Sequence, residues 1–87
     1  MRVDYSDKFI KQLTKSPNQI KQAFKKRLAL FIQDKYHPLL KNHPLQGKLK
    51  GCNSINITGD WRAVFEEYST KNLIVFLLFG THSQLYK

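Results

Sequence analysis

Apolar residues recur at helical spacing in the first half of the chain. Phe9, Ile10 and Leu13 share one face of a short segment that begins after Ser6. Ser6 is a favourable N-cap, because its hydroxyl can accept a hydrogen bond from an amide of the first turn. A longer apolar stripe covers 20–32, with lysines on the opposite face. The pattern predicts a helical hairpin that is apolar on its inner side.

The second predicted helix has signals at both ends. Ser16, Pro17 and Gln19 form the pattern of an N-cap, a proline at the first helical position and a capping-box partner. A His-Pro pair follows at 37–38, and the residue before a proline disfavours helix. We therefore expect this helix to run from Pro17 to about Tyr36.

The second half of the chain changes to a period of two. SINIT alternates between polar and apolar residues, and Gly59-Asp60 separates it from WRAVFEEY, as in a β-hairpin. The run LIVFLLF at Leu73–Phe79 is continuously apolar, which is typical of a central strand covered on both faces. RVDY near the start also alternates, and a further short strand could lie at 48–50.

These elements predict an α+β fold with the order β-α-α-β-β-β and an optional fourth strand in the second half. Two helices would pack on one face of a small, mostly antiparallel, twisted sheet, and the other face would be partly open. The chain has 87 residues without a repeat or a linker, so we expect a single domain over 1–87.

Charge is the strongest compositional signal. Fifteen lysines and arginines against six acidic residues give a formal net charge of +9. Between Lys8 and Lys50 the only acidic residue is Asp34. Such a charge distribution attracts polyanions and makes their binding sensitive to salt. A nucleic acid or an acidic protein is therefore a better expectation than a merely solvated lysine face.

Cysteine usage and hydropathy bear on the compartment. Cys52 is the only cysteine, the N-terminus lacks the pattern of a signal peptide, and the apolar run at 73–79 is too short to cross a bilayer. We expect a soluble cytoplasmic protein with no membrane partner. The histidines and the cysteine match no zinc-binding spacing, so neither a metal nor a cofactor is expected.

General acid–base chemistry on a phosphodiester fits the remaining polar residues. Cleavage of RNA without a metal needs a base for the 2′-OH, cations for the phosphorane and an acid for the leaving 5′-oxygen. His43 and His82 can act as acid or base near neutral pH. Arg62 carries a planar cation suited to phosphate oxygens, and Asp60 could orient a partner or act as a base.

Other residues offer contacts to RNA. Trp61 and Tyr86 present aromatic faces on which unpaired bases can stack, and Lys48 and Lys50 add positive charge. Each also has an ordinary explanation: Trp61 could plug the sheet. Arg62 could pair with a glutamate on its own strand, and Asp60 could serve only the turn.

Three segments resemble a known family. NHPLQGKLKG, GDWRAVFEE and FGTHSQLY are similar, in this order, to segments of the RelE/ParE superfamily of bacterial toxins, in its YafQ-like branch. The resemblance implies a microbial RNase-like fold and a toxin of a type II toxin-antitoxin system. It further implies a ribosome-dependent mRNA endoribonuclease, or mRNA interferase, that cuts mRNA in the ribosomal A site without a cofactor.

The same resemblance implies partners and residue roles. The partners would be the 70S ribosome, mRNA and a cognate antitoxin, in a hetero-oligomeric complex that binds operator DNA through the antitoxin. Position by position, His43, Asp60 and His82 match catalytic residues, with His82 the most important. Trp61 and Tyr86 match aromatic positions of the site.

One position departs from the family pattern. Close relatives carry a histidine four positions before the aspartate, where this chain has Asn56, whose amide can bind phosphate but cannot transfer protons. Arg62 follows the RelE-like pattern and could compensate with positive charge. The identity of the general base stays open. Two other functions also stay open, a ParE-like inhibitor of DNA gyrase and a basic module that binds RNA or the ribosome without cleaving.

Overall fold

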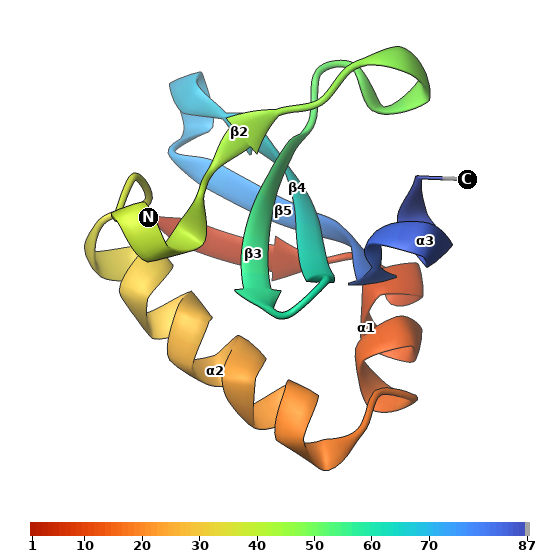
Figure 1. Cartoon of the computed structure of the whole chain (residues 1–87). Coiled ribbons are helices and arrows are strands. Elements are labelled where there is room, and N and C mark those ends of the chain that lie inside the picture. The colour runs from red at the N-terminus through yellow and green to blue at the C-terminus, as the bar shows by residue number, and fades with distance from the viewer. Residues whose placement is uncertain (87) are drawn as a thin grey trace.

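The computed structural model describes residues 1–86. The chain forms a five-stranded sheet in the order β1-β5-β4-β3-β2, with the longer helices gathered beside it (Figure 1). The elements are β1 Arg2–Tyr5, α1 Asp7–Thr14, α2 Asn18–Gln33, β2 His43–Pro44, β3 Asn53–Thr58, β4 Trp61–Tyr68, β5 Leu73–Thr81 and α3 His82–Leu85.

The sheet is mixed, and one of its faces carries the helical hairpin. β1 pairs parallel with β5, while the pairs β5-β4, β4-β3 and β3-β2 are antiparallel. α1 packs on β5 and α2 packs on β3. This arrangement confirms the predicted α+β fold, with two helices on one face of a mostly antiparallel sheet.

The core between the hairpin and the sheet is built from aromatic rings. Neighbouring phenylalanine rings lie with their centroids between 5.1 Å and 5.7 Å apart, many in tilted or edge-to-face contact. Such pairs contribute about 0.5–1.5 kcal/mol each beyond the burial of their surface. All six phenylalanines of the chain take part: Phe9, Phe24, Phe31, Phe65, Phe76 and Phe79.

The prediction for the start of the first helix is confirmed, and that for the second is wrong. The Ser6 hydroxyl accepts a hydrogen bond from the Phe9 amide at 3.0 Å. The Ser16 hydroxyl instead donates to the Gln12 carbonyl at 2.9 Å, at the end of α1. Pro17 and not Ser16 occupies the N-cap position of α2, so this helix starts without a side-chain cap.

α2 also ends earlier than predicted. Its last residue is Gln33, and Asp34 is already extended, with φ −156°. The Asp34 carboxylate accepts a hydrogen bond from the Tyr36 amide at 3.0 Å, which stabilises a turn instead of another helical residue.

Two predictions about strands need correction. The additional short strand is His43–Pro44, paired with β3, while 48–50 lies in and beside a single 3₁₀ turn. Gly47 and Gly51 have φ of +68° and +96°, so the backbone bends on both sides of this segment. β5 has a strand on each side, but only its helix-facing side is deeply buried; on the other, Val75 and Leu77 are half-buried.

Within the part of the chain that the structure describes, α2 is the longest helix, and neither it nor any other helix has the length and apolar character required to span a bilayer.

Candidate functional site

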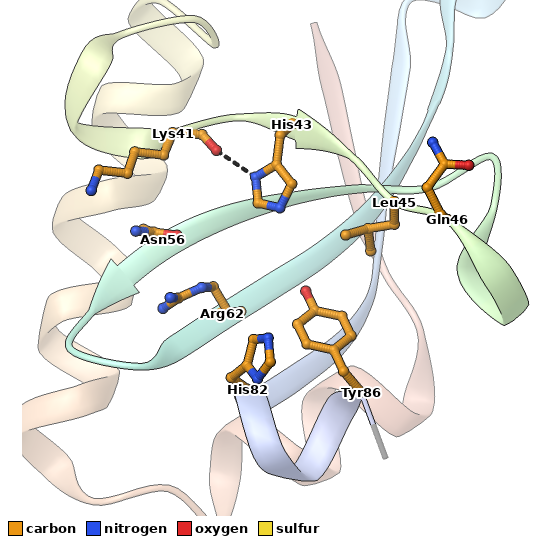
Figure 2. Close-up of a pocket in the computed structure, with 8 residues that line it drawn as sticks. All are labelled: Lys41, His43, Leu45, Gln46, Asn56, Arg62, His82 and Tyr86. Carbon is orange, nitrogen blue, oxygen red and sulfur yellow. Dashed lines mark hydrogen bonds between the residues drawn. The ribbon is translucent and has the colours of Figure 1, made fainter.

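A pocket of about 590 Å³ opens on the sheet face away from the helical hairpin. β2 and the loop after it form one wall, β3 and β4 form the floor, and α3 forms the opposite wall (Figure 2). Segments far apart in the sequence therefore meet here. The lining residues are Lys41, His43, Leu45, Gln46, Asn56, Arg62, His82 and Tyr86.

The floor is a cross-strand pair. Asn56 on β3 lies opposite Arg62 on β4, and Arg62 lies opposite Gly80 on β5. The Nη1 group of Arg62 donates to the carbonyls of Gly59 and Trp61 at 2.9 Å and 3.0 Å. These two bonds fix the guanidinium beside the hairpin tip. Among residues 1–86 neither Nε nor Nη2 of Arg62 has a hydrogen-bond partner, so both are available to bind an anion.

His43 enters the pocket from β2 with a defined tautomer. Its Nδ1 lies 2.7 Å from the Lys41 carbonyl oxygen, as the dashed line in Figure 2 marks. A carbonyl only accepts, so Nδ1 carries the proton in the neutral ring. Nε2 then has its lone pair exposed toward the pocket. This is the arrangement that a general base requires.

His82 faces this imidazole from the other wall, at the start of α3. Its backbone N–H donates to the Asp60 carbonyl at 2.8 Å, which ties α3 to the β3-β4 turn. Thr81 and Gln84 form a capping box around the same end of the helix. Tyr86 lies one turn later and contacts the His82 ring edge-on, with centroids 4.6 Å apart.

The charge of the lining is one-sided. Lys41 and Arg62 are cationic, both histidines can be, and none of the eight lining residues is acidic. The described chain contains no group of three or more His, Cys, Asp or Glu side chains arranged to hold a metal ion. Burial raises the pKa of the Cys52 thiol, helped by Glu66, so this buried cysteine is not an activated nucleophile.

The predicted site residues outside the pocket have several locations. Asp60 is at the exposed hairpin tip and contributes its backbone carbonyl to His82, while its side chain does not line the pocket. Lys48 lines a neighbouring hollow of about 360 Å³ that shares Gln46 and Tyr86 with the pocket. Lys50 lines neither of these two cavities.

Trp61 lies on the opposite side of the sheet from Arg62. Its ring packs on Phe79 at 5.7 Å and lines a separate hollow next to α1, together with Gln12 and Lys15. Successive residues of a strand point to opposite faces, so Trp61 and Arg62 cannot both face the pocket. This consequence of the strand pattern could have been drawn from the sequence.

Sequence reasoning missed three lining residues, Lys41, Leu45 and Gln46. Leu45 and Gln46 belong to the HPLQG motif, and Lys41 stands two positions before His43, so the period of a strand could have pointed to it. The half-buried Tyr86 also makes a contact that no local pattern signals, a hydrogen bond from its hydroxyl to Ser54 Oγ at 3.0 Å.

Solved structures with the same architecture define the fold class. YafQ from E. coli strain BL21(DE3) is 24% identical and superposes with a TM-score of 0.83, with 100% of both chains covered. A chain of the E. coli DinJ-YafQ toxin-antitoxin complex is 25% identical, with 98% of this chain and 96% of that chain covered and a TM-score of 0.79. A YoeB/ParE toxin from Agrobacterium tumefaciens, 15% identical, covers 94% of this chain and 99% of its own at a TM-score of 0.77. The fold is that of RelE-like toxins.

The sequence identifies the family within these toxins to which the chain belongs. The family model described as the bacterial toxin of type II toxin-antitoxin system, YafQ, matches residues 1–87. The chain therefore belongs to the YafQ family of type II toxins. No curated protein matches it.

Proposed function

We propose that this toxin is a ribosome-dependent endoribonuclease that cleaves mRNA by metal-independent acid–base catalysis. The observation that carries the proposal is the pocket in which His43, Arg62 and His82 converge from three separate segments, without an acidic side chain in the lining. Two imidazoles on facing walls, with a guanidinium on the floor between them, match the needs of phosphodiester cleavage.

The reaction begins with the 2′-hydroxyl of the nucleotide before the cleaved bond. His43 Nε2 takes the 2′-OH proton as the 2′-oxygen attacks phosphorus, and Arg62 with Lys41 stabilises the charge on the phosphorane oxygens. His82, protonated, gives its proton to the 5′-oxygen as the P–O5′ bond breaks. The products are a 2′,3′-cyclic phosphate and a 5′-hydroxyl, with one proton taken up and one released by the enzyme.

The remaining predicted residues support this reaction without taking part in the proton transfers. Asn56 donates hydrogen bonds to the phosphate or the ribose, and Tyr86 stacks on a base. Asp60 acts through the hairpin tip that holds His82, which favours His43 over Asp60 as the base. Lys48 and Lys50 bind the RNA backbone beyond Tyr86, and Trp61 contacts a different part of the ribosomal complex because it lies behind the sheet.

The partners follow from charge and from the family. The net charge of +9 suits the 70S ribosome and mRNA as well as an acidic antitoxin. The similar E. coli toxin forms a complex named DinJ-YafQ, and a cognate antitoxin is accordingly the partner that neutralises this chain. The toxin-antitoxin complex is hetero-oligomeric and binds its operator DNA through the antitoxin.

The test compares wild type, His82→Ala and a matched histidine control in bacteria. His37 lies outside the pocket, and its Nδ1 accepts from the Leu39 amide, so His37→Asn keeps a capping acceptor. Growth is followed after induction, and 5′ ends are mapped on a translated reporter mRNA and on an untranslated copy. We expect arrest and new ends in the translated message for wild type and His37→Asn, and neither for His82→Ala. Arrest with intact mRNA that survives His82→Ala would favour gyrase inhibition or simple binding.

A further inference from the structure

Ser54 is an unusual residue for its position on β3. Its exposed fraction is 0%, like that of its apolar neighbour Ile55, yet it carries a hydroxyl. A buried hydroxyl without a partner costs about 1–3 kcal/mol, so a serine in such a place needs a hydrogen bond. Tyr86 provides this partner, because its hydroxyl donates to Ser54 Oγ at 3.0 Å.

This hydrogen bond holds the end of a helix that cannot be stable alone. α3 comprises only His82–Leu85, and so short a helix has too few hydrogen bonds to offset its nucleation cost. Its first residue is tied to the Asp60 carbonyl through the backbone N–H of His82. Tyr86, directly after its last residue, is tied to β3 through Ser54. The two bonds hold α3 at both ends against the sheet.

The Tyr86 ring in turn restricts the positions that the His82 imidazole can adopt. The two rings meet edge-on at a centroid distance of 4.6 Å and an interplanar angle of 68°. His82 is otherwise exposed, so this contact limits the rotamers its side chain can adopt. Ser54 also lies opposite His43 in the β2-β3 register. The buried hydroxyl of Ser54 thus lies close to the two segments that carry His43 and His82.

We propose that Ser54 is a positioning residue that holds the His82 imidazole toward the pocket by anchoring Tyr86. The catalytic consequence rests on the proposed nuclease function, while the effect on the His82 ring does not depend on it. Ser54 itself transfers no proton and touches no substrate. Ser54 acts through Tyr86 alone, so its effect on His82 can be distinguished from a general effect on folding.

A double-mutant cycle tests the catalytic part. Ser54→Ala and Tyr86→Phe each remove one side of the hydrogen bond, and the exposed Ser83 provides the control variant Ser83→Ala. In a cell-free translation system we expect Ser54→Ala to lower kcat about tenfold and to change KM less than about twofold. Adding Ser54→Ala to Tyr86→Phe should cost nothing further. Losses that multiply in the double variant would overturn the proposal, because Ser54 would then act by another route.

An NMR measurement tests the positional part without any need for activity. The ring protons of His82 report the neighbouring Tyr86 ring through its ring current. We expect Ser54→Ala and Tyr86→Phe to move these signals toward those of a freely rotating histidine, and Ser83→Ala to leave them in place. If Ser54→Ala does not fold, Tyr86→Phe still tests the claim, because it deletes only a hydroxyl.

The two measurements separate the two hypotheses. A wild-type protein that cleaves no RNA, but whose His82 signals shift in Ser54→Ala, would refute the nuclease function and retain the positioning role. Cleavage by wild type together with unchanged kcat and unchanged His82 signals in Ser54→Ala would refute the positioning role and retain the nuclease.

Discussion

Replacing Gly80 with alanine tests whether the close contact between β5 and α3 holds α3 in position. A methyl group at this position would lie 2.8 Å from Gln84 Oε1 and 3.4 Å from Leu85 Cδ2. The Gln84 side chain is flexible and can withdraw, but it then gives up its hydrogen bond from the Thr81 amide, now 2.9 Å long. The substitution therefore opens the capping box at the end of α3 that carries His82.

The magnitude follows from these contacts. One hydrogen bond of this kind contributes about 0.5–1.5 kcal/mol, and alanine in place of glycine returns about 0.4–1 kcal/mol by restricting the unfolded chain. The free energy of unfolding should thus change by less than about 1 kcal/mol. Cleavage should fall about ten- to a hundredfold, because a small displacement of a catalytic group is costly.

Urea unfolding and mRNA cleavage in cell-free translation measure the two quantities. Gln84→Ala is the matched background, because it removes the oxygen that the new methyl group would meet. We expect Gly80→Ala to add no loss of cleavage in that background. Wild-type cleavage by Gly80→Ala, with reduced cleavage by Gln84→Ala, would refute the steric argument.

Three further predictions concern the floor of the pocket and two groups outside it. Arg62→Lys should lower kcat about a hundredfold in the reporter assay, because a lysine cannot make the bidentate contact to phosphate; near-normal kcat would exclude Arg62 from the chemistry. The Glu67 carboxylate raises the pKa of Lys35, so this pair stabilises the fold below the unfolded pKa of 10.5, and the contribution is lost as pH rises through the folded value. Urea unfolding from about pH 9 to about pH 12, the range of a raised lysine titration, should show this loss in the wild type and not in Glu67→Gln. Burial raises the pKa of Cys52, so iodoacetamide should label the native chain at least about tenfold more slowly than the unfolded chain at pH 8, and equal rates would contradict its burial.

Local signals in the sequence identified some element boundaries correctly and others incorrectly. Ser6 caps α1 as its position predicts, and the Gly59-Asp60 turn joins β3 to β4. Ser16 has an equally good local pattern, but its hydroxyl binds the preceding helix instead. A capping signature identifies candidate acceptors, and the fold decides which one is used.

The candidate site could be predicted only in part, because some of its contacts join residues far apart in the sequence. The motifs that carry His43, Arg62 and His82 are visible in the chain, and these three side chains do share one pocket. The contact between Tyr86 and Ser54 joins residues 32 positions apart, and no periodicity reports it. The placement of Trp61 and Arg62 on opposite faces of the sheet could be predicted from the sequence, because successive residues of a strand alternate between the two faces.

The most direct measurement of the central claim uses the nucleophile of the substrate. A reporter mRNA is prepared with a single 2′-deoxynucleotide immediately before the mapped cleavage position, and it is translated in the cell-free system beside the all-ribose message. The account predicts cleavage of the ribose message, with a 2′,3′-cyclic phosphate on the upstream fragment, and none at the deoxy position. Equal cleavage of the two messages would contradict attack by the 2′-hydroxyl, and with it the roles proposed for His43 and His82.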